Sequence, residues 1–582
     1  MEKILYSVSS GGIRVAVQLP DDAGSGCGRI TFYNTSNGQR LFVTNGLNLL
    51  CPVVDGERLR PALQSIRQQE GLLELVFSGG GLTELVLTLD GRGEALLLSS
   101  SFLASGTELN ALEILPSGSM VNFYDLINFR NHHGTPSTWP ELPLADKVDT
   151  TTFSSDWQFA PHPSMLLFRK NETVVLAAPL DLPKAFGFRF RCTRYLLEQW
   201  DLDYGPAGHG EPLTAGQRWS SPVFALVKEE RPAAGRDYDA NVYGAIDRYC
   251  QLLIQGGYIP DPARRERYRW HRENLYCTWV DEAYTNRSRM VMELQNQSEW
   301  SNARDCLNES LVRQAVEVIR REQLPFTTIL IDSGWQKARG QWEVDTQKFP
   351  DFRGLIDELH DQGFKVILWI NFADIDDGAA VDEAFLCPGY RNRHGLRVWN
   401  YSDPLVQREY LDPLIRRMIS DEPGCYNADG IKTDFLADKV HPDTPCTPQW
   451  RGEENYLVHL IGHVYRTMKR YKPDSCHIGC AGHPYLAEYM DVIRTYDIFT
   501  SNVREHLERG RMVRHCSAGT PVAFDFHNLN ENFDQYFTAA ADNGCSVEVG
   551  SILGMKRDYL ADWEPADAAF YDLLRQGLRR FL

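Results

Sequence analysis

Two patterns of hydrophobic and polar residues divide the chain, and the first covers residues 1–227. Here short apolar runs are separated by tight-turn residues, as in LLELVFSGGGLTELVLTLDGRGEALLLSS (72–100), where Gly-rich and Asp-Gly turns separate three runs. The stretch AFGFRFRC (185–192) alternates with period two. This part contains no helical pattern of any length, so we predict that residues 1–227 form an N-terminal β-sandwich.

The boundary between the two patterns lies in a short charged segment. KEERPAAGRD (228–237) is rich in charge and carries proline and glycine, which is typical of a linker. The amphipathic run YDANVYGAIDRYCQLLIQ (238–255) follows and predicts a connecting helix. We therefore assign residues 228–269 to a linker with a connecting helix.

The second pattern, over residues 270–582, alternates strands with amphipathic helices. ESLVRQAVEVIRREQ (309–323) is one such helix, with Leu311, Ala315 and Val318 on one face, and AAFYDLLRQGLRRFL (568–582) is the last. The candidate strands are 274–280, 326–332, 364–370, 430–435, 475–480, 494–500, 520–526 and 545–551. Eight strands with helices between most of them predict a (β/α)8 TIM barrel over residues 270–582.

Composition excludes several classes of protein. A net charge of −18 argues against a nucleic-acid or anionic-membrane partner. Thirteen cysteines without a regular framework fit reduced thiols, and no run approaches the length of a membrane span. The N-terminal segment lacks the apolar core of a signal peptide, so we expect a cytoplasmic protein.

Cofactor and metal motifs do not occur in the sequence. It contains neither a G-x-S-x-G elbow nor a P-loop. The string CHIGCAGH (476–483) brings thiols and imidazoles together but lacks the paired C-x2-C of a structural zinc site. We expect no metal and no cofactor.

Candidate site residues gather where the predicted barrel strands end. In a TIM barrel the active site is built at the carboxyl ends of the strands. Those ends carry Trp279, Asp281, Asp332, Trp335, Trp369, Lys432, Asp434, Cys480 and Asp525, while Arg494 and Asp497 flank strand six. Carboxylates accept hydrogen bonds from hydroxyl groups, and tryptophan covers the apolar face of a sugar. The set therefore suits a polyhydroxylated substrate.

Glycoside hydrolysis needs two carboxyl groups that flank the scissile bond. In GIKTDF (430–435), strand alternation places Lys432 and Asp434 on the same side. We predict that Asp434 is the nucleophile because the nearby Lys432 would hold it ionised. The acid must come from another position of the rim, where Asp497, Glu505 and Asp525 are available.

Four segments, in this order, resemble the barrel of the retaining α-glycosidases of glycoside hydrolase families 27, 31 and 36. They are IDSGWQ (331–336), FPDFRGLIDELHDQGFKVILWI (349–370), SDPLVQREYL (402–411) and GIKTDF. The resemblance implies a β-sandwich before the barrel and the nucleophile role for Asp434. IRTYDIF (493–499) resembles the strand-six motif, which implies that Arg494 binds the sugar and that Asp497 is the acid/base. CAGH (480–483) resembles a substrate loop and implies a role for Cys480.

Two departures from the family pattern bear on these roles. The α-galactosidases carry adjacent aspartates in DDGW, whereas this chain has Asp332 followed by Ser333, so half of a hydroxyl clamp is missing. Family 36 members have TSDN after strand six, whereas this chain has TSNVRE (500–505), with Asn502 at the aspartate's position. In that alignment Glu505 is the acid.

The sequence therefore predicts a retaining, exo-acting α-glycoside hydrolase, α-galactosidase-like, with an Asp nucleophile and an Asp acid/base. Asp332, Lys432, Arg494, Trp369, Trp279, Trp335, Cys480 and Asp281 are the expected substrate-binding residues. The expected partner is an α-linked oligosaccharide or glycoside, and a homo-oligomer is compatible with the resemblance. Alternatives are α-glucosidase or α-xylosidase specificity, transglycosylation on the same site, and a catalytically silent carbohydrate-binding protein.

Overall fold

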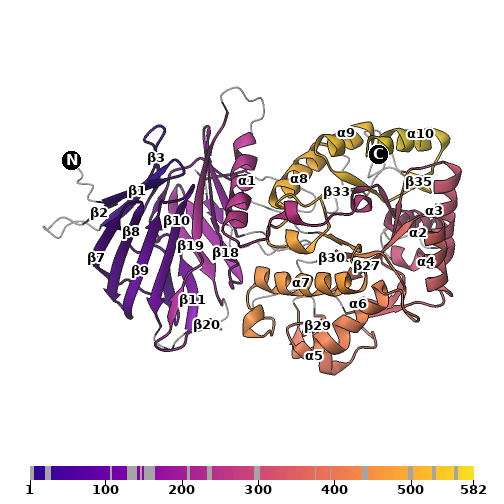
Figure 1. Cartoon of the computed structure of the whole chain (residues 1–582), viewed down its shortest axis with the longest axis horizontal. Coiled ribbons are helices and arrows are strands. Elements are labelled where there is room, and N and C mark those ends of the chain that lie inside the picture. The colour runs from indigo at the N-terminus through magenta and orange to yellow at the C-terminus, as the bar shows by residue number, and fades with distance from the viewer. Residues whose placement is uncertain are drawn as a thin grey trace.

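The computed structural model shows a β-sandwich and a barrel joined by helix α1 (Ala240–Gln255), which stands between them (Figure 1). The structure describes residues 6–19, 28–104, 106, 108–127, 141–144, 147–149, 164–205, 210–232, 239–293, 302–373, 375–392, 395–435, 443–480, 482–495, 503–526, 533–555 and 562–581. The predicted fold class, a β-sandwich followed by a (β/α)8 barrel, is confirmed.

Two antiparallel sheets form the sandwich. The first runs in the order β1 (Tyr6–Ser10), β2 (Ile13–Gln18), β3 (Arg29–Asn34), β4 (Arg40–Val43), β12 (Met120–Val121), β19 (Leu196–Asp203), β11 (Glu108–Glu113), β5 (Cys51–Val54) and β6 (Glu57–Arg58), with β15 (Lys147–Asp149), β18 (Gly187–Thr193) and β20 (Glu211–Pro212) beside it. The second runs in the order β14 (Glu141–Pro143), β13 (Asp125–Ile127), β16 (Leu166–Lys170), β17 (Thr173–Pro179), β22 (Phe224–Glu230), β10 (Leu96–Leu103), β9 (Leu82–Asp90), β8 (Leu72–Gly79) and β7 (Ala62–Gln69), with β21 (Arg218–Ser220) on β10. Strand β22 thus ends three residues beyond the predicted boundary at residue 227.

The sandwich core lies between the two sheets and is aromatic at its centre. The ring of Phe168 lies 5.3 Å from Phe42 and 5.3 Å from Trp200, centroid to centroid. Alternate residues of the strands supply this core, as Leu85, Leu87 and Leu89 do from β9. The apolar residues of the period-two pattern in the sequence therefore form the face that each sheet buries.

Eight parallel strands close into the barrel. Their order is β23 (Leu275–Cys277), β24 (Thr328–Ile331), β27 (Lys365–Asn371), β30 (Gly430–Asp434), β31 (Cys476–Gly479), β32 (Val492–Arg494), β33 (Val522–Phe526) and β34 (Ser546–Val549). The helices of this half are α2 (Trp279–Glu293), α3 (Glu309–Arg321), α4 (Phe352–Asp361), α5 (Pro404–Val406), α6 (Asp412–Ile419), α7 (Glu453–Tyr471), α8 (Val503–Cys516), α9 (Phe533–Asp542) and α10 (Ala568–Leu578). Short hairpins are β25 (Gln336–Ala338) with β26 (Gln341–Val344), β28 (Leu386–Arg391) with β29 (Arg397–Trp399), and β35 (Gly554–Met555) with β36 (Glu564–Pro565).

Strand limits differ from the sequence prediction by a few residues, and two of the differences move a candidate site residue. The run 274–280 was expected to be one strand, but β23 ends at Cys277 and helix α2 begins at Trp279. The sixth strand, expected at 494–500, is β32 and ends at Arg494. Arg494 therefore lies at the carboxyl end of its strand, whereas the sequence placed it at the beginning.

Alternation along the barrel strands separates an apolar interior layer from a charged one. The apolar layer inside the barrel consists of the side chains of Leu275, Cys277, Leu330, Ile367, Cys476, Ile478, Val492 and Ala523. Lys432 and Asp434 share one face of β30, while Thr433 points the other way and hydrogen-bonds to Nε2 of His477 at 2.8 Å. The charged layer of the barrel thus lies at the carboxyl ends of its strands.

Lowering the pH should destabilise the barrel, because the buried ring of His477 becomes protonated. Burial lowers the pKa of this histidine to about 4, below the unfolded value of about 6.5. The neutral ring therefore stabilises the fold above pH ~6.5, and that stability is lost as the pH falls from about 6.5 to 4, by about 3 kcal/mol. We expect His477→Gln to lose less unfolding free energy than the wild type between pH 7 and pH 4, by urea titration. An equal loss in both proteins would contradict this role.

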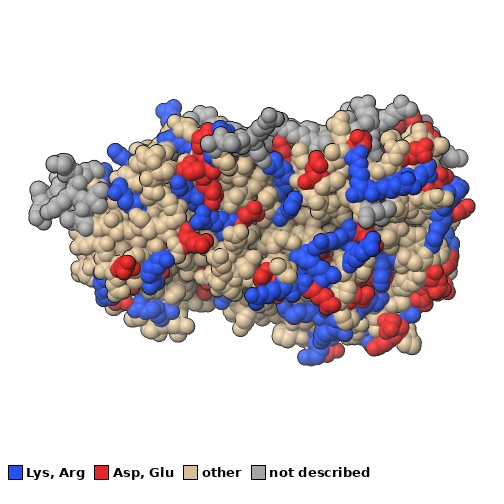
Figure 2. All heavy atoms as spheres, turned by 45° about the horizontal axis from the view of Figure 1, so that its top comes forward, with Lys and Arg blue, Asp and Glu red and all other residues tan. Residues whose placement is uncertain are grey.

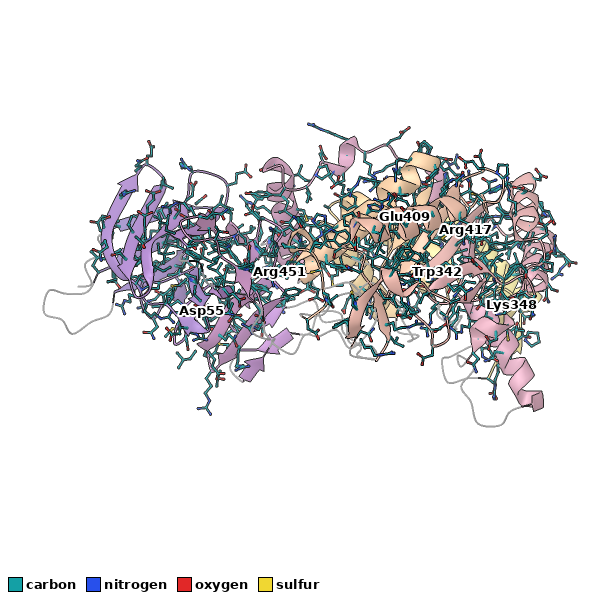
Figure 3. The ribbon with its side chains drawn as sticks, turned by 90° about the horizontal axis from the view of Figure 1, so that it is seen from below. Asp55, Trp342, Lys348, Glu409, Arg417 and Arg451 are labelled. Carbon is teal, nitrogen blue, oxygen red and sulfur yellow. The ribbon has the colours of Figure 1, made fainter. Side chains whose placement is uncertain are left out.

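The sandwich and the barrel meet through close backbone contacts. Gly452 has a φ of +94°, and a Cβ at this position would lie 2.5 Å from the backbone of Lys184 in the sandwich domain. The guanidinium of Arg451, which lies at this junction in Figure 3, donates to the backbone oxygen of Gly210. The hydroxyl of Tyr485 donates to the oxygen of Leu180. These contacts fix the loops after β30 and β31 against the sandwich.

The surface mixes charges of both signs. On the face in Figure 2, basic and acidic side chains are interspersed over the barrel, although the chain as a whole carries a net charge of −18. Within the part of the chain that the structure describes, no helix has the length and apolar character needed to span a membrane.

Candidate active site

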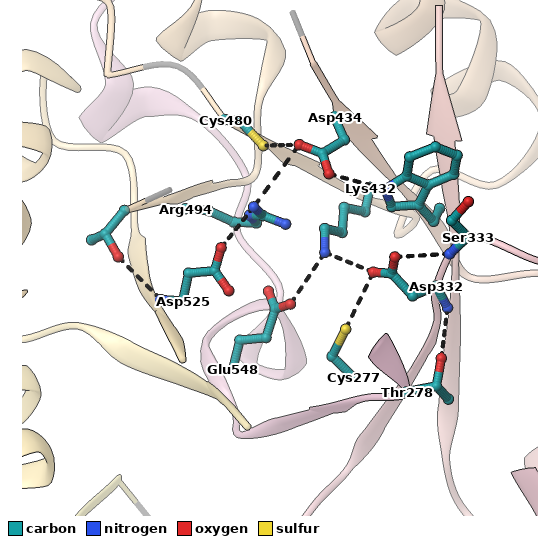
Figure 4. A network of polar contacts seen from close by, with 12 residues as sticks. Cys277, Thr278, Asp332, Ser333, Lys432, Asp434, Cys480, Arg494, Asp525 and Glu548 are labelled. Atoms are coloured by element: carbon teal, nitrogen blue, oxygen red, sulfur yellow. Dashed lines mark hydrogen bonds and ion pairs between the residues drawn. The ribbon is translucent and has the colours of Figure 1, made fainter. Parts of the chain in front are cut away.

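The site is built around Asp434, the last residue of β30 (Figure 4). One carboxylate oxygen accepts a hydrogen bond from the indole Nε1 of Trp369 at 3.0 Å. The other accepts from the thiol of Cys480 at 3.2 Å and from the backbone N–H of Phe435 at 3.0 Å. Burial raises the pKa of the Cys480 thiol well above its ordinary value, so the thiol stays protonated and can donate. All three donors to Asp434 are therefore neutral groups.

Lys432 does not form the expected ion pair with Asp434. Its ammonium lies 2.8 Å from Oδ2 of Asp332 and 3.3 Å from Oε1 of Glu548. Burial and Arg494 disfavour the charged lysine, but the carboxylates around it outweigh both, and the pKa of Lys432 lies well above its usual value. Among the described residues Lys432 therefore makes no direct ion pair with Asp434, because its ammonium turns to carboxylates from two other strands.

Asp332, just after β24, is held from three sides. Besides Lys432, its carboxylate accepts from the thiol of Cys277 at 3.2 Å and from the backbone N–H of Ser333 at 2.8 Å. Its own N–H donates to Oγ1 of Thr278 at 3.0 Å. These bonds fix the start of the loop IDSGWQ at the barrel rim.

Arg494 lies at the end of β32 and is fully buried. Its Nη2 is 2.6 Å from Oδ2 of Asp525, on β33, and 3.9 Å from Oδ1 of Asp434. Burial opposes the guanidinium charge, but Asp525 and the other acidic neighbours outweigh it and raise the pKa of Arg494. The nearest cation to Asp434 therefore lies beyond hydrogen-bond distance.

The three tryptophans occupy different environments. Trp369 is buried at the site and binds Asp434. Trp335 is fully buried, stacks on Phe352 at 5.7 Å and donates from Nε1 to the backbone oxygen of Trp369 at 2.9 Å. Trp279 is partly exposed and packs against the apolar barrel interior. This geometry favours Trp369 as a site residue and gives Trp335 a packing role behind it.

Asp281 is turned towards the loop that follows β34. Its carboxylate accepts from the hydroxyls of Tyr276 at 2.7 Å and Ser551 at 2.6 Å. It also accepts from the backbone N–H groups of Ile552 at 3.0 Å and Leu553 at 3.0 Å. Both oxygens are thus used to hold a loop, which favours a structural role over substrate binding.

Of the three candidates for the general acid, the structure describes the side chain of Asp525 only. Asp497 lies outside the described residues, and the side chain of Glu505, in helix α8, is likewise not described. Asp525 is paired with Arg494. An adjacent guanidinium stabilises the ionised form of a carboxylate, which suits a counter-ion better than a general acid.

Sequence reasoning missed Glu548, on β34. It is fully buried beside Lys432, and its Oε2 has no hydrogen-bond partner among the described residues. Burial opposes ionisation of Glu548, but Lys432 and Arg494 outweigh it and lower its pKa. The available signal was a single charged residue in the otherwise apolar or small-residue strand CSVEVGS.

Among the described residues, one group has a geometry suited to a metal, at the opposite end of the barrel. It consists of His271, Cys476 and Asp491, near the starts of β31 and β32. The carboxylate of Asp491 is already 2.6 Å from Arg265 and 3.1 Å from Lys469. Two cations at this distance oppose the binding of a third, so the group is better explained as an ion-pair cluster.

Part of the barrel sequence is similar to known glycosidases. Residues 295–456 match the glycosyl hydrolases family 31 TIM-barrel domain. Over 67 residues, 11% of this chain and 9% of the relative, the chain is 33% identical to the α-xylosidase XylQ of Lactiplantibacillus pentosus.

Solved structures share the two-domain fold at low identity. The α-N-acetylgalactosaminidase NagBb of Bifidobacterium bifidum, in complex with GalNAc, has a TM-score of 0.62 at 10% identity, covering 99% of this chain and 93% of that one. A variant of the GH36 α-galactosidase AgaA of Geobacillus stearothermophilus, in complex with raffinose, has a TM-score of 0.58 at 12% identity, covering 99% and 86%. The expected resemblance is therefore confirmed in the barrel sequence and in the fold.

Proposed function

From a barrel of the α-glycosidase superfamily that includes glycoside hydrolase families 27, 31 and 36, we propose that this protein is a retaining, exo-acting α-glycoside hydrolase. Asp434 is the nucleophile and Asp497 the acid/base. The observation that carries the proposal is the setting of Asp434, which lies buried at a strand end and accepts only neutral hydrogen bonds.

The proposed mechanism has two steps. In the first, a carboxylate oxygen of Asp434 forms a bond to the anomeric carbon while the glycosidic bond breaks, and the leaving oxygen takes a proton from Asp497. In the second, Asp497 takes a proton from water, which attacks the glycosyl ester and releases the sugar with the α configuration. Retaining enzymes hold the two carboxyl groups about 5–5.5 Å apart, and we expect this separation between Asp434 and the acid.

The described residues supply donors and acceptors for sugar hydroxyl groups. Lys432 has two of its three N–H directions on Asp332 and Glu548, which leaves one for a hydroxyl. Arg494 and Asp332 lie on either side of Asp434 in Figure 4. We propose that these three residues, with Trp369 and Cys480, bind the terminal sugar.

The identity of the sugar is best tested with a panel of aryl α-glycosides. The panel should hold galactoside, N-acetylgalactosaminide, glucoside and xyloside, because the similar proteins include an α-galactosidase, an α-N-acetylgalactosaminidase and an α-xylosidase. Ser333 in place of the second aspartate argues against a strong preference for galactose. Product analysis with and without an added sugar acceptor separates hydrolysis from transglycosylation. A protein that binds sugars but turns over none of these substrates would instead be a carbohydrate-binding protein.

The acid/base can be assigned with two variants. We expect Asp497→Ala to reduce kcat by about 10²- to 10⁴-fold on a substrate with a poor leaving group, because general acid catalysis contributes this much. The loss should be smaller with a good leaving group such as nitrophenol, which needs little protonation. If Glu505→Ala shows this pattern and Asp497→Ala does not, the acid role belongs to Glu505.

A further inference from the structure

Two cations lie beside the proposed nucleophile, and each is paired with a carboxylate other than Asp434. Lys432 is held by Asp332 and Glu548, and Arg494 is held by Asp525 at 2.6 Å. Arg494 is 3.9 Å from Asp434. Arg494 thus reaches Asp434 only at the outer limit of an ion pair, and the ammonium of Lys432 pairs with other carboxylates.

We propose that Glu548 is a positioning residue that holds the ammonium of Lys432 away from Asp434 and so keeps Lys432 from pairing with the nucleophile. The inference rests on the proposed nucleophile role of Asp434. Nothing in the resemblance assigned a role to this strand-eight carboxylate.

The geometry of β30 gives the reason for such a residue. Residues i and i+2 of a strand point to the same side and lie about 7 Å apart, so the long side chain of Lys432 is able to reach Asp434. A carboxylate that pairs with an ammonium is stabilised in its ground state and is a weaker nucleophile for it. Glu548, from across the barrel, gives Lys432 a counter-ion on the side away from Asp434.

Charge, more than hydrogen bonding, links Glu548 to its neighbours. Its Oε1 is 3.3 Å from the ammonium, a long hydrogen bond, and its Oε2 has no hydrogen-bond partner among the described residues. An amide of the same shape would keep the packing but lose the attraction for Lys432. Glu548→Gln is therefore the discriminating change, and Glu548→Asp, which keeps the charge, is its conservative counterpart.

Titratable groups from barrel strands and from two helices face this cluster. They are Cys277 on β23, Glu282 on α2, Asp332 after β24, Lys432 and Asp434 on β30, Cys480 after β31, Arg494 on β32, Asp525 on β33, and Tyr536 on α9. Removal of one negative charge from this set leaves the region more positive. With Glu548 neutral, Lys432 keeps Asp332 as its charged partner, and less charge holds its ammonium on the side away from Asp434.

The indole signal of Trp369 offers a measurement that does not need turnover. Because Nε1 of Trp369 donates to Asp434, its ¹H–¹⁵N resonance should report a change in the partners of that carboxylate, with Trp369→Phe used for assignment. We expect this resonance to shift in Glu548→Gln, because an ammonium on Asp434 competes with the indole for the carboxylate, and to return to its wild-type position in Glu548→Asp. A crystal structure of Glu548→Gln should show the ammonium of Lys432 in contact with Asp434.

Asp491→Asn is the matched control, since Asp491 is also a buried, paired carboxylate but lies at the other end of the barrel. It should destabilise the fold and leave the Trp369 resonance unchanged. An unchanged resonance in Glu548→Gln, with Lys432 still on Asp332 in the crystal structure, would overturn the inference even if Asp434 is the nucleophile. Failure of the proposed function would be seen separately, as absence of turnover by the wild type.

Discussion

Replacing Asp434 with alanine is expected to reduce the turnover of an α-glycoside by about 10³-fold or more. In the proposed mechanism the carboxylate forms the covalent bond to the anomeric carbon. Its described neighbours Cys480 and Trp369 donate hydrogen bonds to it and do not replace it as a nucleophile. The measurement is kcat on the best substrate of the glycoside panel, with circular dichroism to verify folding.

Two further results would support or contradict the nucleophile role. Azide should rescue Asp434→Ala by attacking the anomeric carbon in place of the carboxylate, with expulsion of the aglycone and formation of a β-glycosyl azide. The first sugar released by the wild type should be the α anomer by NMR. Release of the β anomer would mean inversion, and Asp434 would then be a base. Asp412→Asn, a carboxylate outside the barrel that pairs with His463, is the control and should keep full activity.

Replacing Lys432 with methionine is expected to destabilise the barrel by about 3–5 kcal/mol at pH 7. The change leaves Asp332 and Glu548 as buried carboxylates without their shared counter-ion, and breaking a buried pair by removing one partner has this effect. Urea titration followed by tryptophan fluorescence measures the difference.

The pH dependence of this loss follows from the direction of the pKa of Glu548. Lys432 lowers that pKa in the wild type, so the pair stabilises the fold above the unfolded glutamate pKa of about 4.3, and this stability is lost as the pH falls further. The difference between wild type and Lys432→Met should therefore shrink at acid pH. Adding Asp332→Asn and Glu548→Gln to Lys432→Met should restore most of the stability at pH 7, because the neutral set leaves no unpaired charge. A difference that stays constant as the pH falls from about 5 to about 3 would contradict the pairing.

Local patterns were sufficient for the fold because each barrel element is built from contiguous residues. Period-two runs in the sandwich and alternating strands and helices after residue 270 record which face of each element is buried. Strand order also followed, since sequential strands of a TIM barrel are neighbours in space. The ends of short strands were less certain, as β32 shows, because its three residues contain too little pattern to set their limits.

The sequence alone determined that Lys432 and Asp434 point into the barrel from the end of one strand, because the alternation of side chains is a local property of an extended chain. Only the tertiary structure decided which partners they meet. Lys432 turns to Asp332 and Glu548, Asp434 receives Trp369 and Cys480, and Asp281 is used by a loop. The physical reason is that closure of the barrel brings side chains from distant strands within bonding distance. Pairing between charges depends on this distance in space, and the spacing of residues along the sequence does not determine it.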